Sequence, residues 1–351
     1  MDKYIFNEGY YHFARDLELY PDAWAFMVWS SRGQGKTYSA LWYALTHDIK
    51  IAYLRRTKDD IDNICNENKI GVDLSPYKPI NRDHGTKIKA RTITKGIGGF
   101  YEDGAEAPVA YAIALSAAKS IKGFDMSDAE WLIFDEAVPS AGEITRRKEG
   151  EMILDLYMTI RRDREQRGRP PLRLIMFANA EDISAPVTNT LEIVDDMAEM
   201  NARREEYRYI KDRGILLHRI ETVNKEKEDS GIFAAMASTA WGRKAFEGDF
   251  AHNDFSCVGT RSLKRMRPYI ELSYNLHKYY IYRHSDDGTL YMCESRGDAL
   301  LKYNLDREID QKRFFREELL RIRADMIEGR MTFQKYSMYD LISNYTKIFD
   351  I

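Results

Sequence analysis

The stretch Ser30-Ser31-Arg32-Gly33-Gln34-Gly35-Lys36-Thr37 decides the fold of this 351-residue chain. It follows an apolar run at residues 25–29 and precedes an amphipathic run at residues 38–45. A short buried strand, a glycine-bearing turn and a helix form the context that a phosphate-binding loop requires. The sequence therefore predicts a nucleotide site at residues 30–37.

Each part of this loop has an expected role toward a nucleotide and Mg²⁺. Backbone N–H groups of the turn and of the helix start face the phosphates, where the helix dipole also favours negative charge. Lys36 is expected to bridge β- and γ-phosphate oxygens, and the Thr37 hydroxyl to hold Mg²⁺. Ser30 replaces the first glycine of the G-x-x-x-x-G-K-[ST] pattern, at some conformational cost if its φ is positive. The predicted nucleotide-binding residues are Ser31, Arg32, Gly33, Gln34, Gly35, Lys36 and Thr37.

A second signal lies further along the chain, where the apolar run at residues 131–134 meets Asp135 and Glu136. Apolar residues that run into two acids are typical of a central parallel strand whose carboxyl end carries function. Ligands of open α/β sheets bind at those carboxyl ends, where a phosphate loop also lies. We therefore expect Asp135 to complete the Mg²⁺ shell and Glu136 to orient or deprotonate the attacking water.

Two further features leave alternatives open. Residues 172–178 predict another core strand, and Asn179 at its end either senses the γ-phosphate or simply forms a strand-end turn.

A predicted helix around residues 153–160 is surrounded by basic residues. The helix dipole alone favours cations at its end. The other interpretation is that one arginine reaches the γ-phosphate of a neighbouring subunit. The basic residues are Arg146, Arg147, Lys148, Arg161, Arg162, Arg164, Arg167, Arg169 and Arg173.

Composition bounds the class of protein. A hydrophobic fraction of 44% and an aromatic fraction of 12% suffice for packed cores, and the length favours two domains. The net charge of −3 neither supports nor refutes a nucleic-acid partner, because local patches can act alone. Three widely spaced cysteines without a CxxC pair favour reduced thiols. With no signal peptide pattern and no apolar run near ~20 residues, we expect a soluble cytoplasmic protein.

The remaining signals predict the organisation of the chain. Aromatic-rich residues 1–22 are expected to be helical, with rings that either pack in the core or stack on adenine. Short β-like runs between residues 86 and 94 predict hairpins on a sheet edge. Residues 198–255 are charged and helical in character, which predicts a linker subdomain with one apolar helix after residue 231. The last unit is expected to contain strands at 269–274, 279–283 and 289–293, and helices at 313–328 and 336–349.

The order of the motifs resembles that of a known family. These motifs are the phosphate loop, Tyr53–Arg56, Ile133–Glu136, Thr159–Glu165 and Phe177–Ala180. They resemble those of the DNA-packaging (encapsidation) ATPases of small podophages with protein-primed genomes, relatives of the large terminases. The resemblance implies an α/β fold with three parts. These are an ASCE-type P-loop ATPase domain with a mainly parallel sheet at 1–197, a helical linker at 198–255, and an α+β domain of degenerate RNase H-like nuclease fold at 256–351.

The same resemblance implies cofactors and partners. ATP and Mg²⁺ are the expected cofactors, and double-stranded DNA is the expected cargo. The family forms a homomeric ring, usually of five subunits, which docks on the portal of a procapsid through a packaging RNA. The protein is then expected in the host cytoplasm, transiently docked on the viral procapsid, with no membrane partner.

Residue roles can also be carried across by position. Arg162 falls where the family has its trans-acting arginine finger, although Arg161 and Arg164 lie close by. The basic residues Arg55, Arg56 and Lys58 match a segment that faces DNA or a neighbouring subunit. Nuclease activity is not expected, because it needs several carboxylates that converge on metal ions. The acids Glu271, Asp286, Asp287 and Asp340 do not form a convincing set.

Three functions from different classes remain in view. The leading hypothesis is a ring motor that couples ATP hydrolysis to translocation of double-stranded DNA into a procapsid. The first rival is a nuclease-bearing terminase, which a convergent acidic cluster in the last domain would favour. The second rival is a non-viral P-loop ATPase switch, which DNA-independent hydrolysis without ring formation would favour.

Overall fold

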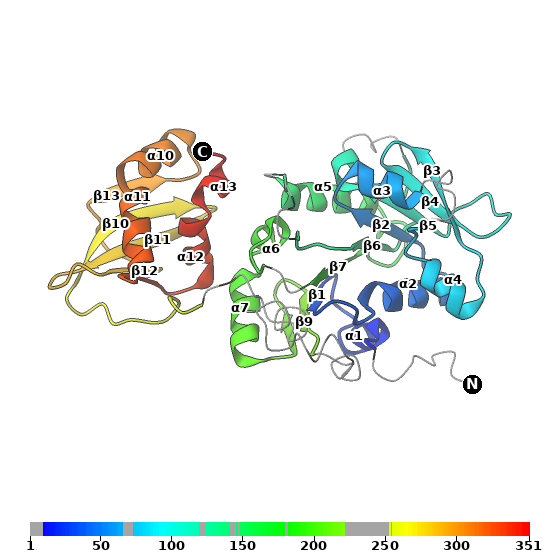
Figure 1. Ribbon diagram of the computed structural model, residues 1–351, viewed down its shortest axis with the longest axis horizontal. Helices are drawn as coiled ribbons and strands as arrows, with labels where there is room; N and C mark the ends of the chain where they lie inside the picture. The colour runs from blue at the N-terminus through cyan, green and yellow to red at the C-terminus, as the bar shows by residue number, and fades with distance from the viewer. Residues whose placement is uncertain are drawn as a thin grey trace, which may run out of the picture. The chain divides into compact units, whose positions relative to one another are not determined.

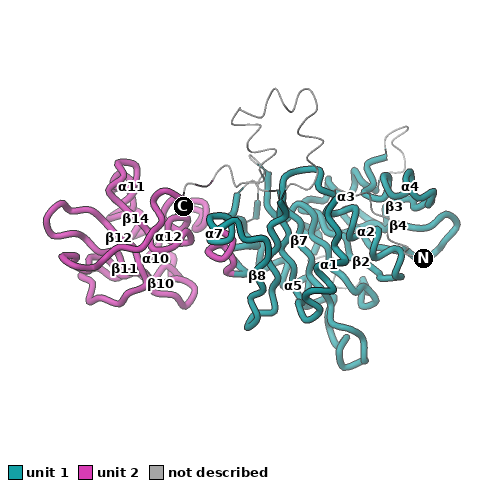
Figure 2. The backbone as a smooth tube through the Cα atoms, turned by 90° about the horizontal axis from the view of Figure 1, so that it is seen from below, with its two compact units in different colours: residues 1–191, 199–252 teal, residues 192–198, 253–351 magenta. Residues whose placement is uncertain are grey.

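The computed structural model describes residues 10–65, 73–118, 124–140, 143, 145–146, 148–179, 182–221, 253 and 255–351. The chain divides into two compact units, which are coloured separately in Figure 2. Unit 1 comprises Met1–Leu191 and Glu199–His252, and unit 2 comprises Glu192–Ala198 and Asn253–Ile351.

Unit 1 is built on a nine-stranded sheet. Its strands are β1 (Ala25–Ser30), β2 (Ile51–Arg55), β3 (Lys89–Thr94), β4 (Ile97–Tyr101), β5 (Ala110–Ala114), β6 (Trp131–Phe134), β7 (Arg173–Asn179), β8 (Tyr207–Ile210) and β9 (Ile215–Arg219). Their order across the sheet is β3-β4-β5-β2-β6-β7-β1-β9-β8. The central six strands pair in parallel, and they are β5, β2, β6, β7, β1 and β9. At the two edges, β3, β4 and β8 pair in antiparallel fashion.

Helices cover both faces of this sheet. Figure 1 shows α2 (Lys36–Thr46) and α5 (Glu149–Arg161) on opposite faces, as right-handed crossovers in opposite directions require. The other helices of unit 1 are α1 (Phe13–Leu19), α3 (Lys58–Cys65), α4 (Lys78–His84), α6 (Pro186–Thr190) and the second half of α7 (Val194–Arg203), whose residues 194–198 belong to unit 2. Because both faces are covered, β1 and β6 are buried at every position. This explains their uninterrupted apolar sequences.

The predicted core strands are all present, and the predicted edge hairpin is the β3–β4 pair. The prediction of a helical linker at 198–255 is wrong at residues 207–210 and 215–219, whereas residues 198–203 belong to the helix α7. Tyr207–Ile210 and Ile215–Arg219 are strands of the large sheet, and β9 pairs with β1. Pairing against a buried central strand overrides the helical character of the local composition. The predicted apolar helix after residue 231 lies outside the described residues.

Unit 2 contains a five-stranded sheet in the order β13-β10-β11-β12-β14. Its strands are β10 (Met266–Tyr274), β11 (His277–His284), β12 (Leu290–Cys293), β13 (Leu301–Asn304) and β14 (Met331–Phe333). Its helical segments are α10 (Glu308–Phe314), the π-helical turn η3 (Phe315–Leu319), α11 (Leu320–Ile327), α12 (Tyr336–Ser343) and α13 (Tyr345–Phe349). Helices and sheet share one core around Ile281, Phe314 and Tyr345.

Sequence patterns located most of unit 2. The helix expected at 336–349 is divided into α12 and α13 at Asn344. The strands β13 and β14 were not predicted. The RNase H-like assignment of this unit stays a prediction. Among the described residues, no helix has the length and apolarity needed to cross a bilayer.

Candidate nucleotide site

The site lies where the parallel strands of unit 1 end. Ser30 at the end of β1 and Asn179 at the end of β7 are register partners. On the other side, β2 pairs with β6 so that Leu54 lies beside Phe134. The residues that follow these two strands therefore meet at the same edge, which is where open α/β sheets bind ligands.

The turn between β1 and α2 depends on two glycines. Gly33 and Gly35 have φ angles of 80° and 85°, in the left-handed region that favours glycine. A Cβ atom at Gly35 would also lie 3.3 Å from Cδ1 of Tyr10. Ser30 is the last residue of β1 and has no positive φ, so serine in place of the usual glycine has no conformational cost here.

Lys36 opens α2 with its side chain buried beneath the turn. Its Nζ donates to Ser30 Oγ at 2.5 Å and to the Ser31 carbonyl at 3.3 Å. Gln34 and Ser31 are also buried, and Gln34 Nε2 donates to Ser31 Oγ at 3.0 Å. Burial lowers the pKa of Lys36 to about 8, although Asp135 opposes the shift. An anionic ligand on the turn would therefore stabilise the charged form of Lys36.

Thr37 and Asp135 are in direct contact although they are far apart in the sequence. Thr37 Oγ1 donates to Asp135 Oδ1 at 2.8 Å. The second carboxylate oxygen of Asp135 accepts from Tyr53 OH at 2.7 Å and from Arg55 at 3.2 Å. Hydroxyl and carboxylate oxygens are ligands that Mg²⁺ prefers. The structure thus brings together the two residues predicted to share a magnesium ion, and the donor set fits that ion.

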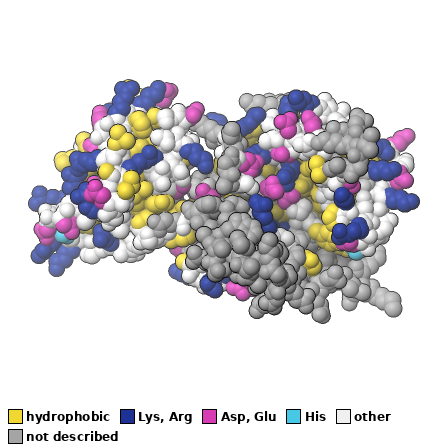
Figure 3. All heavy atoms as spheres, viewed as in Figure 1, with side chains coloured by type: hydrophobic (Ala, Val, Ile, Leu, Met, Phe, Trp, Pro, Cys, Tyr) yellow, Lys and Arg dark blue, Asp and Glu magenta, His cyan; other side chains and the backbone are white. Residues whose placement is uncertain are grey.

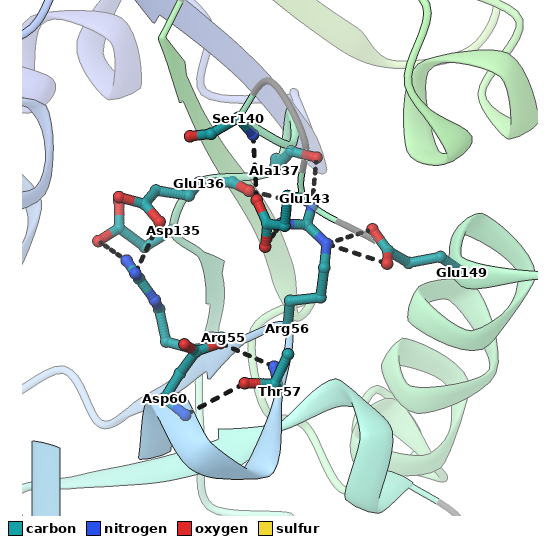
Figure 4. A network of polar contacts seen from close by, with 10 residues as sticks. All are labelled: Arg55, Arg56, Thr57, Asp60, Asp135, Glu136, Ala137, Ser140, Glu143 and Glu149. Carbon is teal, nitrogen blue, oxygen red and sulfur yellow. Dashed lines mark hydrogen bonds and ion pairs between the residues drawn. The ribbon is translucent and has the colours of Figure 1, made fainter. Parts of the chain in front are cut away.

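Arg55 links the two acids that follow β6, as Figure 4 shows. Its guanidinium lies 3.2 Å from Asp135 Oδ2 and 2.6 Å from Glu136 Oε2. Glu136 has a φ of 58°, an unfavourable conformation for a residue other than glycine that is typical of functional sites. Sequence reasoning missed these contacts. Tyr53 and Arg55 alternate onto one face of β2, but only the strand order places that face beside Asp135.

Arg56 is buried in a second ion-pair network (Figure 4). Its Nε lies 3.0 Å from both carboxylate oxygens of Glu149, and its Nη1 lies 2.7 Å from Glu143. The carbonyls of Glu136 and Ala137 accept from its Nη2, each at 3.2 Å. Both guanidinium groups are thus bound to acids of their own chain. That Arg55, Arg56 and Lys58 face DNA or a neighbouring subunit stays a prediction.

Residues 2–314 match a family model described as podovirus DNA encapsidation protein (Gp16). The chain belongs to this encapsidation family. Its role is the packaging of viral DNA. No curated protein matches the chain.

Two solved structures share the fold of this encapsidation protein. A chain of the viral genome packaging motor assembly of bacteriophage Phi-29 is 15% identical with a TM-score of 0.68, over 97% of this chain and 99% of that chain. A chain of the Phi-28 gp11 DNA packaging motor is 17% identical with a TM-score of 0.63, over 98% and 99%. Both matches extend across the two units, which supports a common two-unit α/β architecture.

Arg162 of the encapsidation protein lies away from the phosphate loop. It follows α5 and precedes β7, and its Nη1 lies 3.9 Å from Asp125, in the segment that leads into β6. It is therefore at the amino edge of the parallel strands. A strand such as β7, at about 3.3 Å per residue, separates that edge from the nucleotide edge by roughly 20 Å. Arg162 would therefore not reach a nucleotide bound at the predicted phosphate loop of its own chain.

The three neighbouring arginines differ in their contacts. Arg164 is buried and donates to the carbonyls of Ser127, Ala129 and Pro170. Arg161 forms a bidentate ion pair with Glu165. Arg162 keeps an exposed guanidinium whose Nε donates only to a carbonyl of its own turn, and its φ is 40°. These differences favour Arg162 over its neighbours as an arginine that acts on another subunit.

Arg56→Ala is expected to lower the free energy of unfolding by about 3–5 kcal/mol, because it leaves Glu149 buried without its counter-ion. Urea denaturation measures the change. Arg82→Ala is the matched control, since Arg82 is exposed and forms its ion pair with Asp83, and it should leave the free energy of unfolding close to the wild-type value. An Arg56 variant as stable as that control would show that the buried network does not support unit 1.

Proposed function

We propose that this encapsidation protein is an ATP-driven motor that moves double-stranded viral DNA into a preformed procapsid. The contact of Thr37 Oγ1 with Asp135 Oδ1 carries the proposal, because it joins the two predicted halves of a magnesium–nucleotide site. Lys36 is buried beside that contact and supplies the positive charge for the phosphates.

The residues suggest how hydrolysis proceeds. Bound Mg²⁺ would neutralise charge between the β- and γ-phosphates, and Thr37 and Asp135 would hold it. Glu136 orients the attacking water and accepts its proton. Its ion pair with Arg55 must open first, because the guanidinium 2.6 Å away occupies the carboxylate oxygen that would contact the water. Asn179 lies beside the loop through its register with Ser30, and we assign it to sensing the γ-phosphate.

We further propose a homomeric ring in which each Arg162 completes the site of its neighbour. A trans-acting arginine stabilises the charge that develops on the transferred phosphoryl group. The resemblance to packaging ATPases supports five subunits, docking on the portal of the procapsid through a packaging RNA, and residence in the host cytoplasm. The DNA would be held by its phosphates, because a motor must move over every sequence.

The cutting of DNA is not part of this proposal. A nuclease needs carboxylates that converge on metal ions, and the described residues contain no group of three or more potential metal ligands. Glu271 pairs with Lys278, Asp286 pairs with Arg265, and Asp287 accepts from the Thr289 backbone.

We propose that residues 256–351 form a degenerate RNase H-like domain, and that the ATPase unit extends through β9.

The purified chain with ATP, Mg²⁺, double-stranded DNA and procapsids of its own virus tests the proposed function. We expect hydrolysis that DNA and procapsids stimulate, together with DNA protected from added nuclease inside the capsid. Protection that needs no nucleotide, or hydrolysis that neither DNA nor procapsids affect, would reject the motor. Linear products of defined length from uncut DNA would instead favour the nuclease-bearing alternative.

A further inference from the structure

The segment at the start of α1 lies against the predicted phosphate loop. The Tyr11 backbone N–H donates to the Gln34 carbonyl at 3.0 Å, and the Phe13 backbone N–H donates to Ser39 Oγ of α2 at 2.8 Å. Figure 1 shows α1 beside α2, and the two helices are in contact. Residues 11–13 are therefore attached both to the loop and to the helix that follows it, and we call them the strap.

The bond from Tyr11 fixes the orientation of one peptide group in the loop. A trans peptide is planar, so its carbonyl and its N–H point to opposite sides. With the Gln34 carbonyl held by the strap, the N–H of Gly35 points away from the strap. N–H groups of such turns bind phosphate oxygens. If this peptide turned over, a carbonyl oxygen would replace the N–H and repel the phosphates.

One buried acid holds the strap. On the face of unit 1 drawn in Figure 3, basic and acidic side chains lie interspersed at the surface. Asp16 differs from them, because it is completely buried. Its Oδ2 accepts from Tyr11 OH at 2.5 Å and lies 2.8 Å from His218 Nδ1, whereas its Oδ1 has no hydrogen-bond partner among the described residues. Such a costly carboxylate in a native protein calls for an explanation.

His218 connects Asp16 to the central sheet. It lies on β9, which pairs with β1, the strand that leads directly into the phosphate loop. The ring of Tyr207 stacks on His218 with 4.0 Å between the ring centroids. Burial, and then Asp16, raise the pKa of Tyr11, so the phenol stays protonated and keeps its bond to the carboxylate. The strap is thus tied through one side chain to a strand beside β1, as outer hydrogen bonds hold a preorganised site.

We propose that Asp16 and Tyr11 are positioning residues for nucleotide binding, which hold the Gln34–Gly35 peptide with its N–H toward the phosphates. Neither side chain touches the nucleotide. The proposal rests on the proposed function and concerns the same site. Without the anchor, the loop also populates the flipped peptide, and the apparent dissociation constant rises as the competent fraction falls. Since the N–H contacts the phosphates before and during the reaction, KM should rise while kcat stays unchanged.

The test combines steady-state ATP hydrolysis by the whole chain with calorimetric binding of ADP and Mg²⁺. Tyr11→Phe removes the hydroxyl that bonds to Asp16, and Ser39→Ala removes the acceptor that α2 offers to the strap. Tyr157→Phe is the matched control. It also removes one buried hydroxyl, which donates to the Leu172 carbonyl at 2.8 Å, but from α5 on the opposite face of the sheet.

Tyr11→Phe should raise both the KM for ATP and the dissociation constant of ADP by about 3- to 10-fold, the factor that one net hydrogen bond corresponds to. Ser39→Ala should raise both constants as well. Tyr157→Phe should leave them at the wild-type values, although it loses a buried hydrogen bond of the same kind. Tyr11→Phe with the constants of this control would overturn the proposal. A fall in kcat without a rise in KM would overturn it too.

Asp16 itself is tested by comparing two substitutions. Asp16→Asn keeps an oxygen that accepts from Tyr11, so it should bind ADP more tightly than Asp16→Ala. Equal affinities would contradict the role of the anchor. Hydrogen exchange in the wild-type protein gives a readout that needs no variant to fold. ADP should slow exchange of the Tyr11 amide, because it selects the peptide orientation that this amide holds, and unchanged exchange would overturn the proposal.

Failure of the positioning role and failure of the proposed function give different results. If the wild-type protein binds ADP and hydrolyses ATP but Tyr11→Phe behaves as Tyr157→Phe does, only the positioning role is rejected. If the wild-type protein neither binds ADP nor hydrolyses ATP, the proposed function is rejected together with the positioning role.

Discussion

Lys36→Ala is expected to lower ATP hydrolysis by at least about 100-fold, the usual cost of removing a preorganised donor to a developing charge. The structure gives the physical reason. Lys36 Nζ is held beneath the turn by Ser30 Oγ and the Ser31 carbonyl, within reach of ligands on the loop. Phosphate release from ATP measures the effect, and packaging of DNA should be lost with it.

Two controls separate this effect from misfolding. Lys36 is desolvated and carries a lowered pKa, so its removal should not lower the unfolding temperature. Lys89→Ala removes a lysine of the same sheet whose side chain is exposed and pairs with Asp103, and it should keep full hydrolysis. If Lys36→Ala hydrolysed ATP at the wild-type rate, the phosphate-loop assignment would be lost.

The pH dependence of nucleotide binding gives Lys36 a second readout. In the nucleotide-free protein its pKa is about 8, below the ordinary value for lysine, because burial disfavours the charged form. Bound phosphate favours the charged form and raises the pKa. Below pH 8 affinity should be flat, and above it affinity should fall by up to about tenfold per pH unit, since binding must then take up a proton. Lys36→Ala should abolish this dependence.

Mixtures of Glu136→Gln and Arg162→Ala subunits are expected to regain activity that neither variant has alone. An arginine finger contributes about 10³–10⁵ in turnover, so Arg162→Ala rings should be nearly inactive. In a random equal mixture, an Arg162→Ala subunit keeps Glu136 and can receive Arg162 from a Glu136→Gln neighbour. This combination occurs at about a quarter of the interfaces, which sets the expected recovery.

The structure supplies the matched control for this experiment. Arg161→Ala removes the adjacent arginine, which is held by Glu165, and should leave hydrolysis near the wild-type rate. A mixture with no more activity than its parent variants, although both variants assemble, would show that Arg162 acts in cis or has no part in hydrolysis. Recovery with Arg161→Ala in place of Arg162→Ala would move the finger by one residue.

The sequence was sufficient for the local parts of the site. The strand, turn and helix of the predicted phosphate loop could be located because each is encoded by residues next to one another, with glycines where φ is positive. The acids at 135–136 could be recognised because a strand buried on both faces is an uninterrupted apolar run. That these two segments meet was an inference from the general geometry of parallel sheets, and the Thr37–Asp135 contact confirms it.

The tertiary structure alone decided which basic residues are available to a ligand. Sequence reasoning matched Arg55 and Arg56 to a segment that faces DNA or a neighbouring subunit, and it did not foresee their ion pairs. The pairing of β2 with β6 sets Arg55 against Asp135 and Glu136, and burial sets Arg56 against Glu143 and Glu149. Charge patterns cannot distinguish a free guanidinium from a compensated one, because the compensating acid lies far away in the chain. The same long-range pairing drew β8 and β9 into the sheet and brought His218 against Asp16.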